Sequence, residues 1–593
     1  MKEFVKTMLA VICGLLVLQI LRFLLFFVIF GSALASGSGP SIPRSGVLDL
    51  DLSSFTLAEQ SQESMPAFSL VGGMSSSMVP AVGLKDAVEA IKIAASDPAV
   101  RYILVRADNG VASPAGYEEL RAALTDFRRS GKAVIAYTEN PGNGSYYLSS
   151  VADKIFMGSQ HGGNNTFIGL SGQMQFVKDL LDKLGVNVQL IRHGKYKSAG
   201  EMFIRNSASP ENRQQNLEMV TSVWKSFSGA ICEAREISPE KLDALLDNLS
   251  LVFPEDFLSN GLVDELVDHD ALVQKLCTAA QVEDVSAFHL IGFPDYVSNR
   301  VGVTFPGRSN VAVIYADGEI TDGSDYRSVS GDRFVKVIDE VRRDKSVKAV
   351  VLRVNSPGGS VAASVKIRTA LDQLQKEKPL VASYGTYAAS GGYWISNGCQ
   401  KIYADATTVT GSIGVFSMIP EFSQVTKKVG VGIESVGTHK HSDMFSLVRP
   451  FDATELAAMQ ASVEDIYESF VNLVASSRGM EPSAVDEIAQ GRVWTGADAL
   501  RIGLVDEIGT LQDAITYAAS LADFYSSDEY TVVDYPKPLT VLEEMMYTFG
   551  ASKEEPSILS DTPFAGLGRD LRSLMGGEPA RVYARLPYTI EIR

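Results

Sequence analysis

Ala349-Val-Val-Leu-Arg-Val-Asn-Ser-Pro-Gly-Gly-Ser360 is the stretch that most clearly indicates how this chain folds. Its first six residues are mostly apolar and β-branched, as expected of a buried strand, and the Pro-Gly-Gly that follows is typical of a turn. A helical pattern then runs over Ala363–Lys376. Strands that alternate with helices form largely parallel sheets covered by helices, so the sequence predicts an α/β fold.

The same unit occurs earlier in the chain, which indicates an internal repeat. A shift of 247 positions aligns Arg106 with Arg353 and Tyr146 with Tyr393, and it holds without a gap over about fifty residues. Both copies contain a second apolar run after the helix, at Ala133–Tyr137 and at Leu380–Tyr384. We therefore interpret the chain as a tandem duplication of one α/β domain.

Turn signals divide the chain into four predicted parts. Pro294 and the Phe305-Pro306-Gly307 turn mark the join between the repeats. The predicted parts are an N-terminal anchor and linker at 1–45, a first repeat at 46–307, a second repeat at 308–535 and a C-terminal tail at 536–593.

Length and composition exclude several classes of protein. A chain of 593 residues is too long for one compact core, and 46% hydrophobic with 21% charged residues is an ordinary globular balance. The net charge of −18 makes nucleic acid an unsuitable partner. The four cysteines include no Cys-x-x-Cys pair, so neither a disulfide framework nor a cysteine zinc site is predicted.

The N-terminal stretch Met8–Phe30 is long and apolar enough to cross a bilayer as a helix. Lys2 and Lys6 precede it, which predicts a cytoplasmic N-terminus and places the rest of the chain on the exported side. The alternative is a cleaved signal peptide, since Ala33-Leu34-Ala35 is an acceptable cleavage site. Arg22 weakens both interpretations, because a charge in the bilayer is costly unless it finds a partner.

Two turns of the second repeat contain residues suited to acyl chemistry. Gly358 and Gly359 follow a strand and precede a helix, where their backbone N–H groups could form an oxyanion hole; the alternative is an ordinary tight turn. Ser390 lies in Tyr387–Trp394 among small residues at another strand-to-helix turn, which suits a nucleophile whose own N–H could aid the oxyanion. The alternative for Ser390 is a helix N-cap.

Comparison of the repeats favours a functional role for both turns. Ser390 aligns with Asn143 in the first repeat, and the two glycines align with Val111 and Ala112. If the serine and the glycines served only the fold, both copies should keep them. Their joint loss from the first repeat suggests that they work together.

A serine nucleophile needs a base, and a lysine can serve if burial lowers its pKa. Lys197 in the first repeat and Lys440 in the second are the two candidates. His439 and His441 flank Lys440 and could share a strand face, but two ligands without an evident third give little support for a metal. We predict no metal and no cofactor.

At these residues the chain resembles the signal peptide peptidase A (protease IV) family in its long, two-repeat form. The matching segments lie in the family's order and spacing within roughly 45–535: Tyr196–Ala199, Asn355–Ser360, Tyr387–Trp394 and Thr410–Val415. The resemblance implies two ClpP/crotonase-like domains behind a transmembrane helix, and a serine protease with a Ser-Lys dyad.

The resemblance also implies roles for individual residues. Ser390 corresponds to the nucleophile and Lys197 to the general base, while Gly359 and Gly391 would supply oxyanion N–H groups and Ser412 would orient the lysine amine. The implied substrates are cleaved signal peptides and other unfolded peptides. The implied protein is a homo-oligomer, a tetramer in the family, held by a single span in the inner membrane with its catalytic part in the periplasm.

Some alternatives remain open at this point. Lys440 lies 50 positions after Ser390, close to the dyad spacing of single-repeat members, so it is a second candidate for the base. A crotonase-type enzyme would use the same fold on an acyl-CoA thioester, although no site for the CoA phosphates is evident. A membrane-anchored scaffold without activity is the third possibility, since fold alone does not fix function.

Overall fold

The computed structural model describes Gly14 and residues 42–61, 79–302, 309–537 and 582–585. The predicted membrane anchor, Met8–Phe30, lies outside the described residues apart from Gly14. Within those residues, no helix combines the length and the apolar character that a membrane crossing requires.

The first sheet is built from residues of the first predicted repeat. Its six strands are all parallel, in the order β8-β6-β5-β4-β1-β9. The strands are β1 (Gly46–Asp51), β4 (Val100–Arg106), β5 (Val134–Thr138), β6 (Lys154–Gly158), β8 (Glu265–Val267) and β9 (Leu290–Gly292). β2 (Thr56–Ala58) and β3 (Ala81–Gly83), which come between β1 and β4 in the chain, form a separate parallel pair.

Helices cover both faces of this sheet, as a parallel sheet requires. Apolar residues of α2 and α3 pack on one face, and those of α10 pack on the other. The helices of this part are α2 (Leu84–Ser96), α3 (Pro114–Arg128), α4 (Asn143–Ser149), α5 (Lys178–Leu184), α6 (Glu201–Ile204), α7 (Pro210–Arg235), α8 (Pro239–Asp247), α9 (Pro254–Ser259), α10 (His269–Ala279) and α11 (Phe293–Arg300).

The second sheet repeats this arrangement with residues 309–535. Its main path is β19-β17-β15-β13-β10-β21, and β16 and β20 extend it from β15. All pairs are parallel except β17 with β19. The strands are β10 (Ser309–Asp317), β13 (Val347–Ser356), β15 (Leu380–Ala389), β16 (Ile402–Ala404), β17 (Val409–Gly411), β19 (Val493–Thr495), β20 (Glu507–Ile508) and β21 (Tyr530–Tyr535).

Helices again lie on both faces of the second sheet. α13 lies on one face and α19 on the other. Helix α13 begins after Ser360, whose side chain accepts the N–H of Ala363 at 3.3 Å. The helices are α12 (Gly331–Arg343), α13 (Val361–Gln375), α14 (Gly391–Ser396), α15 (Ser423–Lys428), α16 (Ala453–Arg478), α17 (Pro482–Ile488), α18 (Gly496–Arg501) and α19 (Leu511–Ser520). The predicted α/β fold is confirmed.

A third, mixed sheet joins the two halves, in the order β12-β11-β14-β22-β18-β7. Its strands are β7 (Asn187–Arg192), β11 (Ile320–Thr321), β12 (Val329–Ser330), β14 (Gly358–Ser360), β18 (Phe416–Glu421) and β22 (Val582–Arg585). β7 comes from the first repeat and pairs antiparallel with β18 of the second along six residue pairs. Sequence periodicity did not predict this sheet, because its strands come from three distant parts of the chain.

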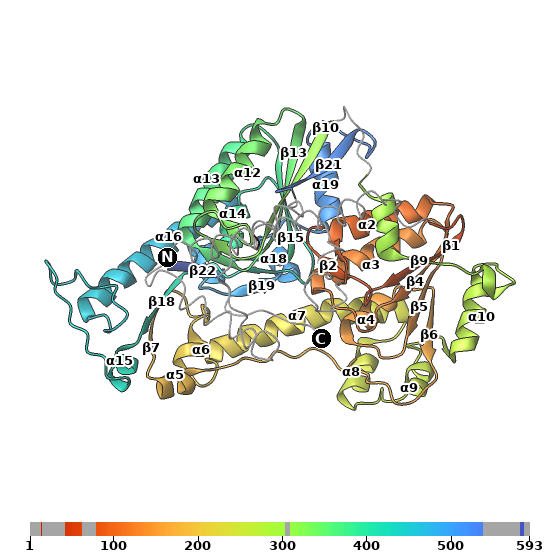
Figure 1. The fold of residues 1–593 in the computed structure, drawn as a ribbon, viewed down its shortest axis with the longest axis horizontal. Coiled ribbons are helices and arrows are strands. Elements are labelled where there is room, and N and C mark those ends of the chain that lie inside the picture. The colour runs from red at the N-terminus through yellow and green to blue at the C-terminus, as the bar shows by residue number, and fades with distance from the viewer. Residues whose placement is uncertain (1–13, 15–41, 62–78, 303–308, 538–581, 586–593) are drawn as a thin grey trace.

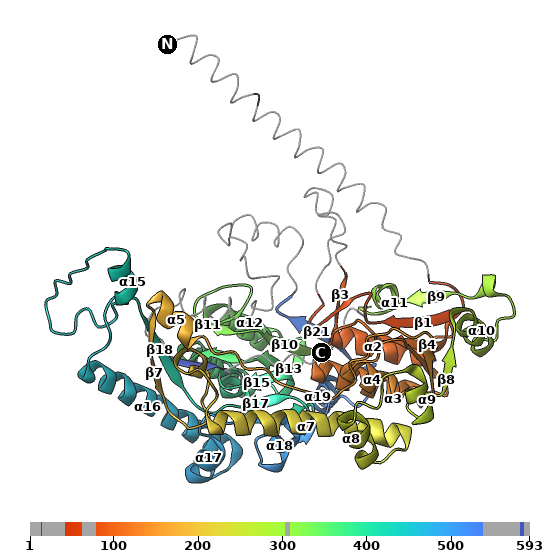
Figure 2. The ribbon, with the colours of Figure 1, turned by 90° about the horizontal axis from the view of Figure 1, so that it is seen from below.

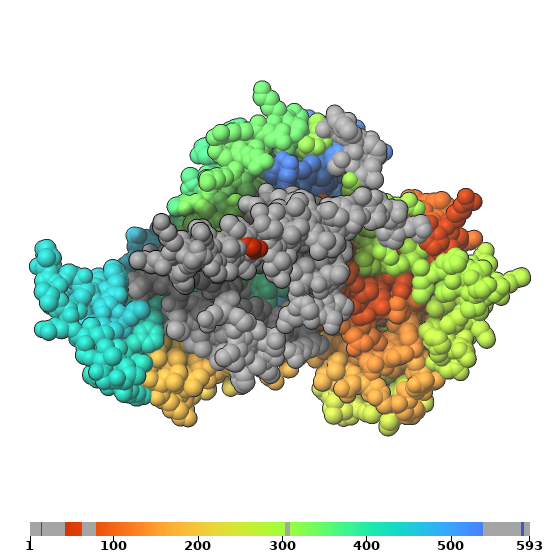
Figure 3. All heavy atoms as spheres, viewed as in Figure 1, coloured from red at the N-terminus to blue at the C-terminus, as the bar shows by residue number. Residues whose placement is uncertain are grey.

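Helix α7 and a buried ion-pair network also hold the halves together. Figure 1 labels α6 and α8 at the two ends of α7, and Figure 2 shows α7 running along the lower part of the view. In the space-filling view, the cyan segment around α15 forms one end of the molecule and the yellow-green segment around α10 the other (Figure 3). Arg353 of the second half, only 1% exposed, pairs with Glu119 at 2.7 Å and Glu59 at 2.9 Å, both from the first half.

Glu118 is a neighbour of this network at the same interface. Its Oε2 accepts the backbone N–H of Thr407 at 3.2 Å. Burial raises the pKa of Glu118 to about 7. The interface between the halves therefore holds a carboxyl group, that of Glu118, which binds its proton more tightly in the folded protein, and this makes the stability of the interface depend on pH.

Candidate active site

Ser390 is held in a strained turn between β15 and α14. Its φ of 55° and ψ of −110° lie in a region that non-glycine residues rarely adopt, and strain of this kind gathers at functional sites. The Ser390 N–H donates to the Gly411 carbonyl at 2.8 Å. The expectation that this N–H would aid an oxyanion is therefore wrong, because it is already used to fix the turn.

Lys197 reaches Ser390 from the loop that follows β7. Its Nζ lies 2.8 Å from Ser390 Oγ, 3.0 Å from Ser412 Oγ and 3.2 Å from the Ser412 carbonyl oxygen. Lys197 is fully buried, and burial lowers the pKa of its ammonium well below the usual range. A neutral amine has two N–H donors and one lone pair, so it can donate twice to Ser412 and accept the hydroxyl proton of Ser390.

Two glycines make room for the lysine stem. A Cβ built at Gly491 would lie 2.5 Å from Lys197 Cβ, and one built at Gly414 would lie 3.4 Å from Lys197 Cδ. Gly491 also has a φ of +77°, which favours glycine. These close approaches exclude water from the stem and account for its burial.

Gln215 on α7 ties the lysine loop to the second repeat. Its Nε2 donates to the Tyr196 carbonyl and to Ser198 Oγ, both at 3.0 Å, and its Oε1 accepts the N–H of Val493 on β19 at 3.4 Å. Within the first repeat, Arg192 at the end of β7 donates to the Lys197 carbonyl at 2.6 Å and so holds the loop to that strand. Sequence reasoning missed both residues, because a glutamine on a long helix and an arginine at a strand end carry no distinctive local signal.

Gly358, Gly359 and Gly391 lie together beside Ser390. A Cβ built at Gly391 would lie 3.1 Å from both Gly359 N and Gly358 Cα. Gly358 and Gly359 have φ values of +96° and +158°, and a Cβ at Gly359 would lie 1.9 Å from the Ile320 carbonyl oxygen. Only glycine fits at these two positions, so the turn exposes backbone in a way that side chains would prevent.

The corresponding position of the first repeat has a different environment. Asn143 donates from Nδ2 to the Gly169 carbonyl at 3.0 Å and accepts the Gly169 N–H on Oδ1 at 2.9 Å. A cavity of about 1360 Å³, lined also by Val111 and Ala112, lies over this position. The first repeat therefore has a cavity at this turn. However, the side-chain amide of Asn143 holds the loop at Gly169, whereas the second repeat has the Ser390 hydroxyl at the same position.

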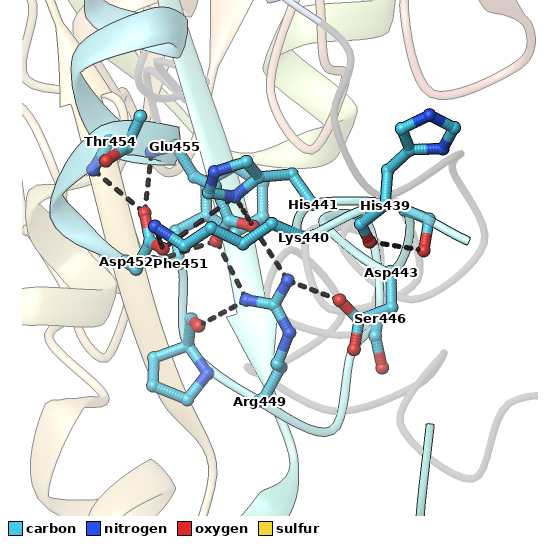
Figure 4. A network of polar contacts seen from close by, with 12 residues as sticks. His439, Lys440, His441, Asp443, Ser446, Arg449, Phe451, Asp452, Thr454 and Glu455 are labelled. Carbon is cyan, nitrogen blue, oxygen red and sulfur yellow. Dashed lines mark hydrogen bonds and ion pairs between the residues drawn. The ribbon is translucent and has the colours of Figure 1, made fainter. Parts of the chain in front are cut away.

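Lys440 does not lie at Ser390. It belongs to an exposed loop between α15 and α16, its side chain is 74% exposed, and its Nζ lies 3.9 Å from Asp452 Oδ2 (Figure 4). Of the two lysines left open by the sequence, the structure brings only Lys197 to the serine. The spacing of Lys440 from Ser390 along the chain does not correspond to a contact in space.

The two histidines beside Lys440 are also accounted for. His439 Nδ1 contacts Thr438 Oγ1 at 2.9 Å. His441, Asp452 and Glu455 bring possible ligand atoms within 4.8 Å of one another. However, the Arg449 guanidinium donates to both Glu455 oxygens, at 2.7 and 2.8 Å, so it already supplies the positive charge at this cluster (Figure 4).

Comparison with known proteins identifies relatives of the chain. The profile of peptidase family S49 matches it twice, at residues 126–283 and 372–524. Protease 4 of Haemophilus influenzae is 34% identical over 506 residues, which cover 82% of this chain and 80% of that protein. The chloroplastic serine protease SPPA of Arabidopsis thaliana is 29% identical over 468 residues, covering 77% and 68%. A putative signal peptide peptidase SppA of Enterococcus faecium is 34% identical over 242 residues, covering 40% and 70%.

Proposed function

Because the chain belongs to peptidase family S49 and is a serine protease, we propose that Ser390 is its nucleophile and that Lys197 is the base that activates it. The 2.8 Å contact between Lys197 Nζ and Ser390 Oγ is the observation that carries the proposal. Burial lowers the pKa of the Lys197 ammonium, which favours the neutral amine, the form that can take a proton. A crotonase-type enzyme or an inactive scaffold would have no use for this contact.

Peptide hydrolysis would then proceed by acyl transfer. Lys197 takes the hydroxyl proton as Ser390 Oγ attacks the peptide carbonyl, and the N–H groups of Gly359 and Gly391 stabilise the oxyanion. Lys197 then protonates the leaving amine, and water hydrolyses the acyl-enzyme. Ser412 accepts the two N–H groups of the amine, which leaves its lone pair directed at Ser390. Gly358 shapes the turn that presents these donors.

The proposed substrates are signal peptides that remain in the membrane after cleavage, together with other unfolded peptides. Two observations support this. The sequence has an apolar stretch at Met8–Phe30 that would place the protease at the membrane, and a relative in Enterococcus faecium carries the name signal peptide peptidase. We further propose that the catalytic part lies on the periplasmic side of the inner membrane and that the protein assembles as a homo-oligomer.

Ser390→Ala tests the nucleophile directly. The purified variant should lose hydrolysis of a synthetic signal peptide, and it should lose labelling by a serine-directed covalent inhibitor. The matched control is Asn143→Ala, which removes the counterpart side chain in the first repeat and should keep both. Hydrolysis by Ser390→Ala at the wild-type rate would refute the assignment, provided thermal unfolding shows that the variant is folded.

Fractionation tests the proposed location. The full chain, expressed in a Gram-negative host, should stay in the membrane pellet after an alkaline carbonate wash, and external protease should reach its catalytic part in spheroplasts. Release of the intact chain into the wash would contradict a membrane anchor.

A further inference from the structure

The first repeat has a cavity where the second repeat has its proposed active site. The cavity has a volume of about 1360 Å³, and Asn109, Glu139 and Asp268, which follow the parallel strands β4, β5 and β8, line it. Ligands of α/β proteins bind at this edge, outside the carboxyl ends of the strands. The volume exceeds the about 300–1,000 Å³ of small-molecule sites, so the cavity has room for a longer ligand.

One wall of the cavity has a backbone edge without a partner. The wall segment Val111–Ser113 aligns with Gly358–Ser360, and each segment ends in a serine that caps the following helix. In the second repeat this segment is β14, which pairs with β11 on one edge and with β22 on the other. In the first repeat it belongs to no sheet, and among the described residues the N–H groups of Val111 and Ala112 find no acceptor. An extended peptide can add to such an edge through its backbone.

The second repeat also contributes to this cavity, through Asn355, Thr386 and Tyr387. Thr386 is only 6% exposed, and its buried Oγ1 has no hydrogen-bond partner within the part of the chain that the structure describes. A buried hydroxyl without a partner is costly, and a backbone group of a bound peptide would supply one. Helix α3, which begins at the unpaired edge, contacts β15, which carries Thr386; Figure 1 labels both near the centre of the molecule.

The side chains of the walls suit a peptide rather than an anion. Among the described residues that line the cavity, none is a lysine or an arginine, and Glu139 and Asp268 are acidic. Such walls do not suit a phosphate or a nucleotide. The side-chain amides of Asn109 and Asn164 can donate and accept, as a peptide backbone requires. Val111, 79% exposed, adds an apolar contact.

Tyr387 connects the cavity with the proposed nucleophile. It lines the cavity and also packs against an apolar cluster that contains Ala389 and Val409. Ser390 lies three residues after Tyr387, which corresponds to about 10 Å at about 3.3 Å per residue of strand. A peptide that is bound at Ser390 therefore needs only a few further residues to reach the cavity.

Resting on the proposed function, we propose that the cavity of the first repeat is a second peptide-binding site, without catalysis, which holds an extended segment of the peptide that is cut at Ser390. The segment adds as a strand to Val111–Ser113 and brings a polar backbone group to Thr386. Asn143 takes no part in this binding, because its amide is already bonded to Gly169. Binding at one site makes binding at the other intramolecular, so a long peptide binds more tightly than a short one.

Kinetics with peptides of two lengths test the proposal on the purified full-length chain. One substrate is a synthetic signal peptide of about 25 residues, and the other is a hexapeptide around its cleaved bond. Val111→Trp fills the cavity beside the unpaired edge, so the ratio of kcat/KM for the long peptide to kcat/KM for the hexapeptide should fall by about tenfold or more, through KM of the long peptide. Val285→Trp is the matched control, because Val285 is a 53% exposed valine of the same repeat that does not line the cavity, and it should keep the wild-type ratio.

Peptide binding without turnover tests the cavity independently of the protease assignment. Ser390→Ala should bind the fluorescently labelled long peptide, and the double variant with Val111→Trp should bind it about tenfold more weakly. Equal affinities of these two proteins, or a wild-type ratio in Val111→Trp, overturn the second site; hydrolysis of both peptides by the wild type then leaves the protease assignment intact. A wild type that hydrolyses neither peptide overturns the protease assignment, and the two affinities still decide whether the cavity binds peptide.

Discussion

Replacing Lys197 with methionine should leave the active site filled but without a base. The methionine side chain occupies nearly the same volume as the lysine stem, so the packing against Gly491 and Gly414 is retained. The lost group is the amine that lies 2.8 Å from Ser390 Oγ and within 3.2 Å of both Ser412 oxygens. The variant should fold, and Ser390 should lose its proton acceptor.

The expected loss in the acylation rate is about 10²–10⁴-fold, the usual contribution of a positioned base. At about 1.36 kcal/mol for each factor of ten, this corresponds to about 2.7–5.4 kcal/mol of transition-state stabilisation. Because burial lowers the pKa of Lys197, the wild-type rate should rise with pH and level off well below 10.5. The remaining rate of Lys197→Met should lack that rise.

The assay is single-turnover cleavage of a synthetic peptide, with the acyl-enzyme detected by mass spectrometry. Lys440→Met is the matched control, since it removes an exposed amine whose pair with Asp452 contributes at most about 1 kcal/mol, and its acylation rate should equal that of the wild type. Equal acylation by Lys197→Met and the wild type, or loss of acylation in Lys440→Met alone, would refute the dyad that spans the two repeats.

Two other substitutions test the oxyanion turn and the interface. In Gly359→Ala the added Cβ would lie 1.9 Å from the Ile320 carbonyl oxygen, so the turn must shift and carry the Gly359 N–H with it. We expect kcat to fall by about 10²–10³-fold, the cost of one oxyanion donor. A wild-type kcat in steady-state kinetics would contradict this role. Glu118 binds its proton more tightly when folded, with a pKa of about 7 against 4.5 unfolded, so it makes stability fall as pH rises from 4.5 to 7. Glu118→Gln should therefore raise the unfolding temperature at pH 8 and change it little at pH 4, and equal shifts at both pH values in calorimetry would contradict the assignment.

Local sequence patterns were enough to predict the α/β fold and to select Ser390 and the Gly358-Gly359 turn as candidates. Each of these depends on a few adjacent residues, such as an apolar run that ends in a glycine turn. Comparison between the repeats added a second test, because Asn143 occupies the place of Ser390 in a copy with the same fold pattern.

Contacts between distant segments could not be derived in the same way. The pairing of Lys197 with Ser390 depends on β7 crossing to β18, and without the family resemblance the sequence left Lys440 equally open. The hydrogen bond from the Ser390 N–H to Gly411 depends on the register of β15 with β17. The sequence does not show this register, so it could not show that the N–H is unavailable to an oxyanion. The four residues of β22 are too few for a periodic pattern, so only their neighbours in space define them as a strand.

Because the proton acceptor and the nucleophile lie on different repeats, the active site of a newly made chain can form only late in synthesis. Lys197 and Ser390 are 193 residues apart, so a ribosome working at about 5–20 residues per second needs about 10–40 s to pass from one to the other. Val493 must follow as well, because Gln215 fastens the lysine loop to it. A nascent chain therefore stays inert toward the polypeptides around it until its second half has been synthesised and has docked on the first.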